Sequence, residues 1–85
     1  MTTELSALII AETAAWEAFN AANLSYVDAQ RAYEASWRER WGGTDEAHAN
    51  LLSARKAREE ASKLLAAARV ARFSAAVSID ASVKL

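Results

Sequence analysis

Large apolar side chains recur along the first half of the chain at alternating intervals of three and four residues. They fall in two rows, Ile9, Trp16, Asn23, Gln30, Trp37 and Leu5, Glu12, Phe19, Tyr26, Tyr33. Such a heptad pattern is typical of a helix that packs along its whole length. The pattern therefore predicts one long helix over about residues 3–41.

The second half repeats with the same period, but its repeating residues are small. The row is Ala47, Ala54, Ala57, Ala61, Leu64, Ala68, Ala71, Ala75. It predicts a second helix over about residues 45–76. Helix cores interdigitate large side chains with small ones, so we expect the two helices to fold onto each other as an antiparallel hairpin.

The first helix carries a further row of small residues on its other side. These are Ala11, Ala14, Ala18, Ala21, Ser25, Asp28, Ala32, Ala35. Small side chains allow a second element to approach closely, but alanine is also simply the best helix former. The row has two interpretations, and the sequence does not choose between them.

The stretch Trp41-Gly42-Gly43-Thr44-Asp45-Glu46 separates the two predicted helices and holds both glycines of the chain. Glycine reaches positive φ without a Cβ clash and favours the position just past a helix end. Thr44 offers a hydroxyl that caps a new helix, and two acids follow in its first turn, where the helix dipole favours negative charge. We expect a turn over residues 42–44.

The last nine residues change period from helical to two. Apolar residues at Val77, Ile79, Ala81, Val83 and Leu85 alternate with polar ones. This alternation is typical of a half-buried strand and predicts an extended tail over residues 77–85. A tail of this kind can add a strand to a partner's sheet through Val77, Ile79, Val83 and Leu85, whereas the alternative is a disordered or helical terminus.

One hairpin covers only one side of each helix, which leaves bulky side chains to be covered by something else. The candidate residues for self-association or partner binding are the aromatic ones, Trp16, Phe19, Tyr26, Tyr33, Trp37 and Trp41. The small size of the chain also favours completion by another copy or a partner, giving a four-helix bundle or a larger assembly. The expected fold is all-α, with a single domain over residues 1–85.

Charge divides between the two predicted helices. Residues 1–37 carry five acids and one base, and residues 47–75 carry six bases and two acids. The second helix presents a candidate face for an anionic partner, formed by Arg55, Arg58, Arg69 and Arg72. Nucleic-acid binding through this face predicts a steep salt dependence, but the net charge of −1 favours pairing of the arginines with the acidic first helix or exposure to water.

Little in the sequence indicates catalysis or a cofactor. The chain has no cysteine and one histidine, His48, and both glycines belong to the turn, so we expect no enzyme, no cofactor and no metal site. The apolar run from Ala7 to Ala11 is too short to span a membrane, and Glu4 stands where a signal peptide carries basic residues. We therefore expect a cytoplasmic protein without a membrane partner.

A hairpin of two helices joined at Trp-x-Gly, here Trp41-Gly42-Gly43 followed by Thr44-Asp45-Glu46-Ala47, resembles the WXG100 (ESAT-6-like) family. The resemblance implies a four-helix dimer that is secreted by a type VII system and acts as an adaptor or effector. That family or its partners carry Tyr-x-x-x-Asp/Glu after the second helix, and here no tyrosine follows Tyr33.

Three functions therefore stand as hypotheses. The first is a non-enzymatic interaction module that associates with itself and with another protein, as an accessory part of a larger assembly such as a viral particle, or as a stoichiometric inhibitor or adaptor. The second is the secreted WXG100-like protein, and the third is a nucleic-acid binder acting through the basic second helix.

Overall fold

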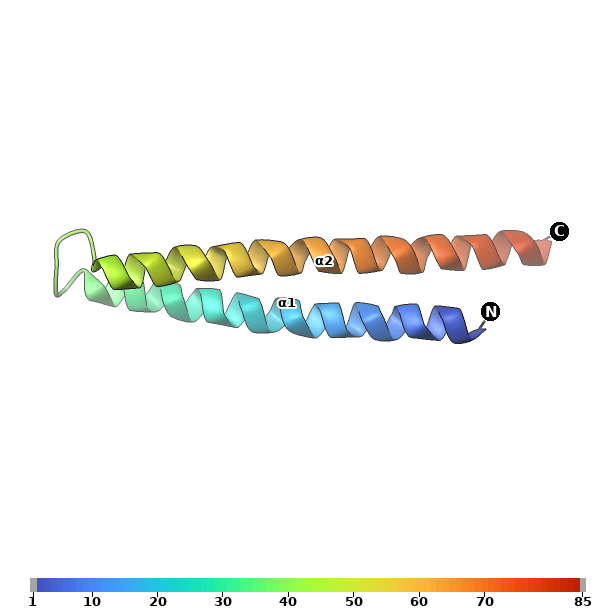
Figure 1. Ribbon diagram of the computed structural model, residues 1–85, viewed down its shortest axis with the longest axis horizontal. Coiled ribbons are helices and arrows are strands. Elements are labelled where there is room, and N and C mark those ends of the chain that lie inside the picture. Colours follow the sequence, from blue (N-terminus) through green and yellow to red (C-terminus); the bar gives the residue numbers. More distant parts are fainter. Residues whose placement is uncertain (1, 85) are drawn as a thin grey trace.

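The protein is a hairpin of two long antiparallel helices (Figure 1). The computed structural model describes the backbone of residues 2–84 and the side chains of residues 4–78. Helix α1 spans Thr2–Ser36 and helix α2 spans Asp45–Lys84. The molecule measures 67 × 15 × 12 Å. The prediction of an all-α antiparallel hairpin is confirmed.

The side of α1 that faces α2 keeps the alternating spacing of three and four. Its buried and half-buried positions include Leu5, Leu8, Glu12, Ala15, Phe19, Ala22, Tyr26, Ala29, Tyr33 and Ser36. One of the two predicted rows, from Leu5 to Tyr33, thus faces the second helix. The other row lies at the edge of the contact, where Trp16 is 45% exposed and Trp37 is 43% exposed.

The matching side of α2 differs in part from the predicted small row. The positions that face α1 are Ala47, Leu51, Ala54, Arg58, Ala61, Leu65, Ala68, Arg72 and Ala75. Ala57, Leu64 and Ala71 were expected in this row but are exposed. The reason is the spacing: from Ala47 the contact advances by four and then by three, which places Leu51, Arg58, Leu65 and Arg72 between the alanines.

Helix α1 ends at Ser36, five residues before the predicted end at Trp41. The Ser36 hydroxyl donates a hydrogen bond to the Tyr33 carbonyl at 2.7 Å and accepts one from the Thr44 amide at 3.1 Å. This side chain therefore holds the two ends of the turn together. The chain then passes through short turns, with the Trp37 amide donating to the Glu34 carbonyl.

Two glycines and a threonine complete the turn as the sequence predicts. Gly42 and Gly43 have φ of 87° and 84°, in the left-handed region that glycine tolerates best. The Thr44 hydroxyl accepts a hydrogen bond from the Ala47 amide at 3.2 Å, which is the geometry of a helix N-cap. The glycines of the turn and the N-cap of α2 therefore lie where their residue types require them.

Helix α2 continues to Lys84, so the predicted strand-like tail is wrong over residues 77–84. A single extended segment has no partner for its backbone groups, whereas a helix satisfies them within the segment. Continuation of an existing helix also avoids a new nucleation step. Strand addition by this segment would require α2 to unwind first. Leu85 and the side chains of Ile79 and Val83 lie outside the described residues.

The hydrophobic core of the hairpin is very small. Among the described residues, Leu51 and Leu65 are the only buried hydrophobic side chains, at 7% and 5% exposure. Eleven large hydrophobic side chains are exposed, namely Ile9, Ile10, Trp16, Leu24, Trp37, Trp41, Leu52, Leu64, Val70, Phe73 and Val77. The hairpin thus leaves most of its large apolar side chains in contact with water.

Candidate interaction surfaces

Three aromatic side chains and the histidine cluster at the turn end of the hairpin. The rings of Tyr33 and Trp37 meet edge to face at 6.2 Å between centroids, and those of Trp37 and Trp41 at 5.5 Å. The Tyr33 ring also lies 5.5 Å from the His48 ring on α2, and its hydroxyl donates a hydrogen bond to the Gly42 carbonyl at 3.0 Å. Tyr33 thus connects both helices to the turn.

Trp41 is the most exposed large hydrophobic side chain of the described residues, at 91%. Its backbone sits in a well-fixed turn, in which the Gly43 amide donates to the Arg40 carbonyl at 2.8 Å. Arg40 also forms an exposed ion pair with Asp45 at 3.4 Å. A tryptophan held on a fixed turn loses little conformational freedom on binding, and tryptophan is enriched among the residues that dominate interface energies. We call Trp37, Trp41 and the turn between them the tip.

The six aromatic residues predicted as one binding surface occupy three different environments. Phe19, Tyr26 and Tyr33 are half-buried against α2. Trp16 and Trp37 lie at the edge of the helix contact, and Trp41 extends from the turn. The Trp16 and Phe19 rings stack at 6.1 Å. The first three therefore stabilise the hairpin itself, and of these six residues the three tryptophans are the exposed ones.

The four arginines predicted as an anionic-partner face are also divided. Arg69 and Arg72 both form ion pairs with Glu12 of α1, at 3.6 Å from the Arg69 Nε to the nearer oxygen. The Glu12 side chain is only 19% exposed. The Arg58 guanidinium lies over the Tyr26 ring at 4.1 Å, and Arg69 lies over Trp16 at 5.4 Å.

Arg55 is exposed on α2. Three of the four arginines thus pack against α1, and two of them, Arg69 and Arg72, pair with one of its acids as expected. They are held by one carboxylate and two aromatic rings rather than being presented together to a phosphate backbone.

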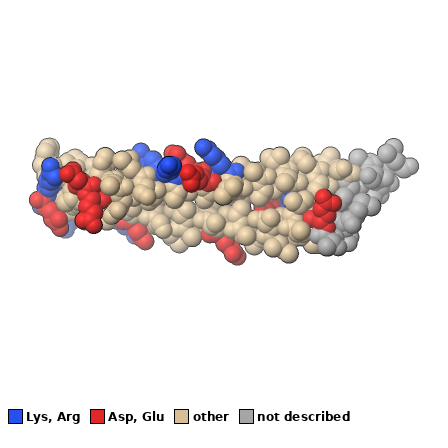
Figure 2. Space-filling view, viewed as in Figure 1, with Lys and Arg blue, Asp and Glu red and all other residues tan. Residues whose placement is uncertain are grey.

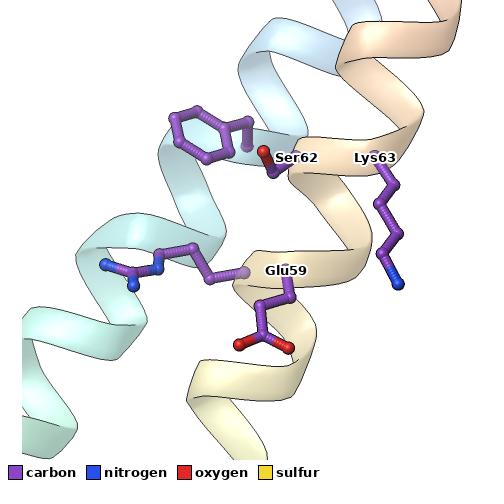
Figure 3. A pocket seen from close by; sticks show the side chains of 5 residues that line it. Glu59, Ser62 and Lys63 are labelled. Atoms are coloured by element: carbon purple, nitrogen blue, oxygen red, sulfur yellow. The ribbon is translucent and has the colours of Figure 1, made fainter.

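A shallow hollow opens between the helices beside Phe19. It is lined by Phe19, Arg58, Glu59, Ser62 and Lys63. Figure 3 shows Ser62 pointing toward α1, whereas Lys63 extends along the side of α2 that lies away from α1. Opposite charges border this open hollow, so it does not select a ligand of one sign.

The two long sides of the hairpin differ in chemistry. The side that carries Trp16 and Arg69 also carries Ile9, Trp37, Leu52 and Phe73 by helix periodicity, and we call it the tryptophan flank. The opposite side we call the alanine flank. Its exposed residues are Glu4, Ala7, Ala11, Ala14, Ala18, Ala21, Ser25, Asp28, Ala32 and Ala35 of α1 and Glu46, Asn50, Ser53, Ala57, Glu60, Leu64, Ala67, Ala71, Ser74 and Ser78 of α2.

Figure 2 shows the alanine flank, because the helices are right-handed and α2 runs from left to right above α1. Much of this face is tan, and its charged side chains are denser toward the turn end. The acids Glu4, Asp28, Glu46 and Glu60 lie on this flank, and none of its members named above is basic. The flank is therefore acidic, with three of its acids toward the turn and Glu4 near the free end of α1.

Comparison with protein-family models, curated proteins and solved structures gives no match. Within the described residues, no three side chains are grouped as metal ligands would be, and neither helix has a stretch apolar enough to cross a bilayer. The interaction surfaces described above are therefore the features from which a function can be argued.

Sequence reasoning missed the central role of Glu12. Glu12 belongs to the predicted row from Leu5 to Tyr33, and a carboxylate that is covered by a second helix needs a partner. Arg72 occupies the same kind of position on α2, three heptads after Leu51. Counting heptads from Leu51 rather than from the alanines places Arg58, Leu65 and Arg72 in the contact between the helices. This count could have indicated the Glu12–Arg72 pair from the sequence.

Proposed function

We propose that this protein is a non-enzymatic interaction module that associates with itself through a flank of the hairpin and binds another protein at the tip. The observation that carries this proposal is the solvent-accessible area of the single chain, 6432 Å². A compact monomer of 9.2 kDa exposes ~4,900 Å². The hairpin therefore exposes roughly 1,500 Å² more than a compact protein of its mass.

This excess has the size of a protein interface. A standard interface removes about 800 Å² from each partner, and more extensive obligate interfaces remove larger areas. Part of the exposed area is also apolar. Four large hydrophobic side chains on the helices are each more than 60% exposed, namely Ile10, Leu24, Leu64 and Phe73. Helical hairpins reach compactness by pairing into four-helix bundles.

The tip supports a second contact, with a different protein. Trp41 and Trp37 form an aromatic pair at one end of the molecule, away from the broad flanks. A small module of this kind acts as an accessory part of a larger assembly, or as a stoichiometric inhibitor or adaptor, by placing its tip in an apolar pocket of its target.

The experiment that tests self-association is the solution mass, measured by light scattering on a sizing column over a range of chain concentrations. We expect a dimer or a larger oligomer with a mass that is a multiple of 9.2 kDa. A monomer at every concentration would overturn self-association. The Trp41→Ala variant should keep both the mass and the melting temperature, because its ring is largely exposed in the single chain.

A second candidate is a WXG100-like secreted protein. The observation that favours it is that Trp41, Gly42 and Gly43 lie in the turn between two antiparallel helices. No tyrosine follows Tyr33, so the export signal would come from a partner chain. The test is export: secretion should stop when the type VII system of the source cell is removed, and unchanged secretion would exclude this candidate.

A further inference from the structure

Two arginines of α2 share a single carboxylate of α1 toward the free ends of the helices. Arg72 contacts both oxygens of Glu12, through its Nε and Nη2 atoms. The Nε atom of Arg69 lies 3.6 Å from Oε1 of the same carboxylate, which is longer than a hydrogen bond. Glu12 therefore bonds to Arg72, and the Arg69 guanidinium keeps donors for which no described group is an acceptor.

This ion cluster carries one uncompensated positive charge. It holds one acid, Glu12, and two bases, Arg69 and Arg72. The other described acids at this end of the hairpin are Glu4, on the alanine flank, and Glu17, on the outer side of α1 by helix periodicity. Neither forms an ion pair among the described residues. The cluster is therefore a local positive site on a chain whose net charge is −1.

Apolar side chains from both helices border the free guanidinium. Its central carbon lies 5.4 Å from the centroid of the Trp16 ring, within cation–π range, and the Arg69 side chain is still 54% exposed. Ile9 and Trp16 stand three residues before and four after Glu12, so both adjoin it on α1. Phe73 adjoins Arg69 one turn later on α2 and is 68% exposed.

From this geometry we infer that the tryptophan flank binds an acidic amphipathic helix of another protein. In this contact a carboxylate of the bound helix pairs with the Arg69 guanidinium, and its apolar side chains pack on the apolar residues around that guanidinium. A guanidinium that is already oriented and has free donors suits a carboxylate, with which it forms paired bonds. Tryptophan and arginine are also enriched among the residues that dominate interface energies. The contact is additional to the one proposed at the tip and depends neither on it nor on self-association.

The layout of the flank favours a helix over a nucleic-acid strand. Ile9 and Trp16 lie on one side of α1 about 10 Å apart along its axis, which matches anchors at i and i+7 of a bound helix. A nucleic acid presents phosphates at every step and is bound by many bases. Toward the turn the flank adds Arg55 but also Glu34 and Glu59, so its bases form no continuous row.

A displayed library of helical peptides tests which chemistry the flank selects. The peptides are about five turns long, with randomised residues at i, i+3, i+4 and i+7, and they are selected on the full-length chain. We expect the enriched peptides to combine an aspartate or glutamate with large apolar residues at this spacing. The affinity of each is then measured by fluorescence anisotropy of the labelled peptide.

Arg69 and Arg55 form a matched pair of test and control. Both are exposed at the same heptad position of α2, but in the described structure Arg55 forms no ion pair and lies over no aromatic ring. Arg69→Gln should weaken an enriched peptide about tenfold or more, as expected for a hydrogen bond between charged groups, whereas Arg55→Gln should not. Both variants should keep the helix content and the solution mass of the wild type.

A charge exchange separates direct pairing from damage to the hairpin. Replacing the acid of the peptide by its amide should weaken binding as much as Arg69→Gln does, and the two effects should not add. Arg69→Glu should abolish binding of the acidic peptide and restore it for a peptide with lysine in place of the acid. Restored binding supports the inference, because a damaged hairpin would bind neither peptide.

Four results would overturn the inference. The first is a selection that yields no binder, and the second is a set of peptides that bind the Arg69→Gln variant as well as the wild type. The third is a labelled single-stranded oligonucleotide that binds more tightly than the peptides through Arg69, which would make the partner a nucleic acid. The fourth is dissociation of an oligomer by Arg69→Gln, which would place a second copy on this flank. Trp41 lies outside the site, so none of these results bears on the tip.

Discussion

Leu65→Ala is the most informative single substitution, because the adjacent leucine is its internal control. Leu65 is 5% exposed and faces α1, whereas Leu64 is 67% exposed on the alanine flank. Both leucines lie in the middle of α2, so replacement by alanine changes helix propensity equally in the two variants. Any difference between them reports burial alone.

The magnitude follows from the size of the core. Truncation of a fully buried leucine to alanine costs about 2–5 kcal/mol, with the lower values where neighbours relax into the space. Leu65 is contacted from one side by a single helix, so we expect ~2–3 kcal/mol. A chain of this length has a total stability of roughly 4–13 kcal/mol, so the loss is a large fraction of the total. The melting temperature should fall by about 10–20 °C.

The assay is thermal unfolding followed by circular dichroism, repeated at several chain concentrations. Leu65→Ala should melt earlier than the wild type at every concentration. Leu64→Ala should melt like the wild type when the chain is dilute and monomeric, because its side chain is 67% exposed there. Equal effects of the two substitutions in the dilute chain would refute the described contact between the helices.

Two further pairs of variants test the turn and the ion cluster. Gly43→Ala should destabilise the hairpin more than Gly42→Ala. Both residues have positive φ, but only at Gly43 would a Cβ lie 2.8 Å from the Tyr33 ring. In urea unfolding we expect a loss of ~1 kcal/mol for Gly42→Ala and of ~2–3 kcal/mol for Gly43→Ala. Glu12→Gln should lower the free energy of unfolding by ~1 kcal/mol at low salt and by less at high salt. The value is modest because its partners Arg69 and Arg72 are partly exposed. Glu17 is exposed, so Glu17→Gln should change the free energy of unfolding little.

The sequence was sufficient for the hairpin because its signals are local. The period of the apolar residues, the adjacent Gly42 and Gly43 and the N-cap at Thr44 each act within a few residues and all favour the same structure. The end of α1 was harder to predict, because it depends on Ser36 bonding to Thr44 across the turn. No pattern within α1 encodes a contact eight residues away.

The candidate surfaces depend on which face of each helix is covered, and this is a tertiary property. Two heptad rows on α1 were equally apolar, and only the rotation of α1 against α2 decides that Phe19 is covered while Trp16 stays at the edge. The period of two over residues 77–84 also led to a wrong prediction, that of an extended tail. Polar residues at alternate positions from Ser78 to Lys84 are typical of a strand, but without a strand partner the helix is the conformation that satisfies the backbone.

The two flanks of the hairpin suit different partners, and this difference follows from the size of their side chains. The small side chains of the alanine flank allow another helix to approach closely, and this leaves room for a copy of the chain in the proposed self-association. Trp16 and Arg69 form a bulky, charged pair on the other flank, and two such pairs brought together would clash and place like charges side by side. A different protein, with a groove and carboxylates, suits that flank better. We therefore expect copies of the chain to meet on one flank and to leave the tryptophans for other molecules.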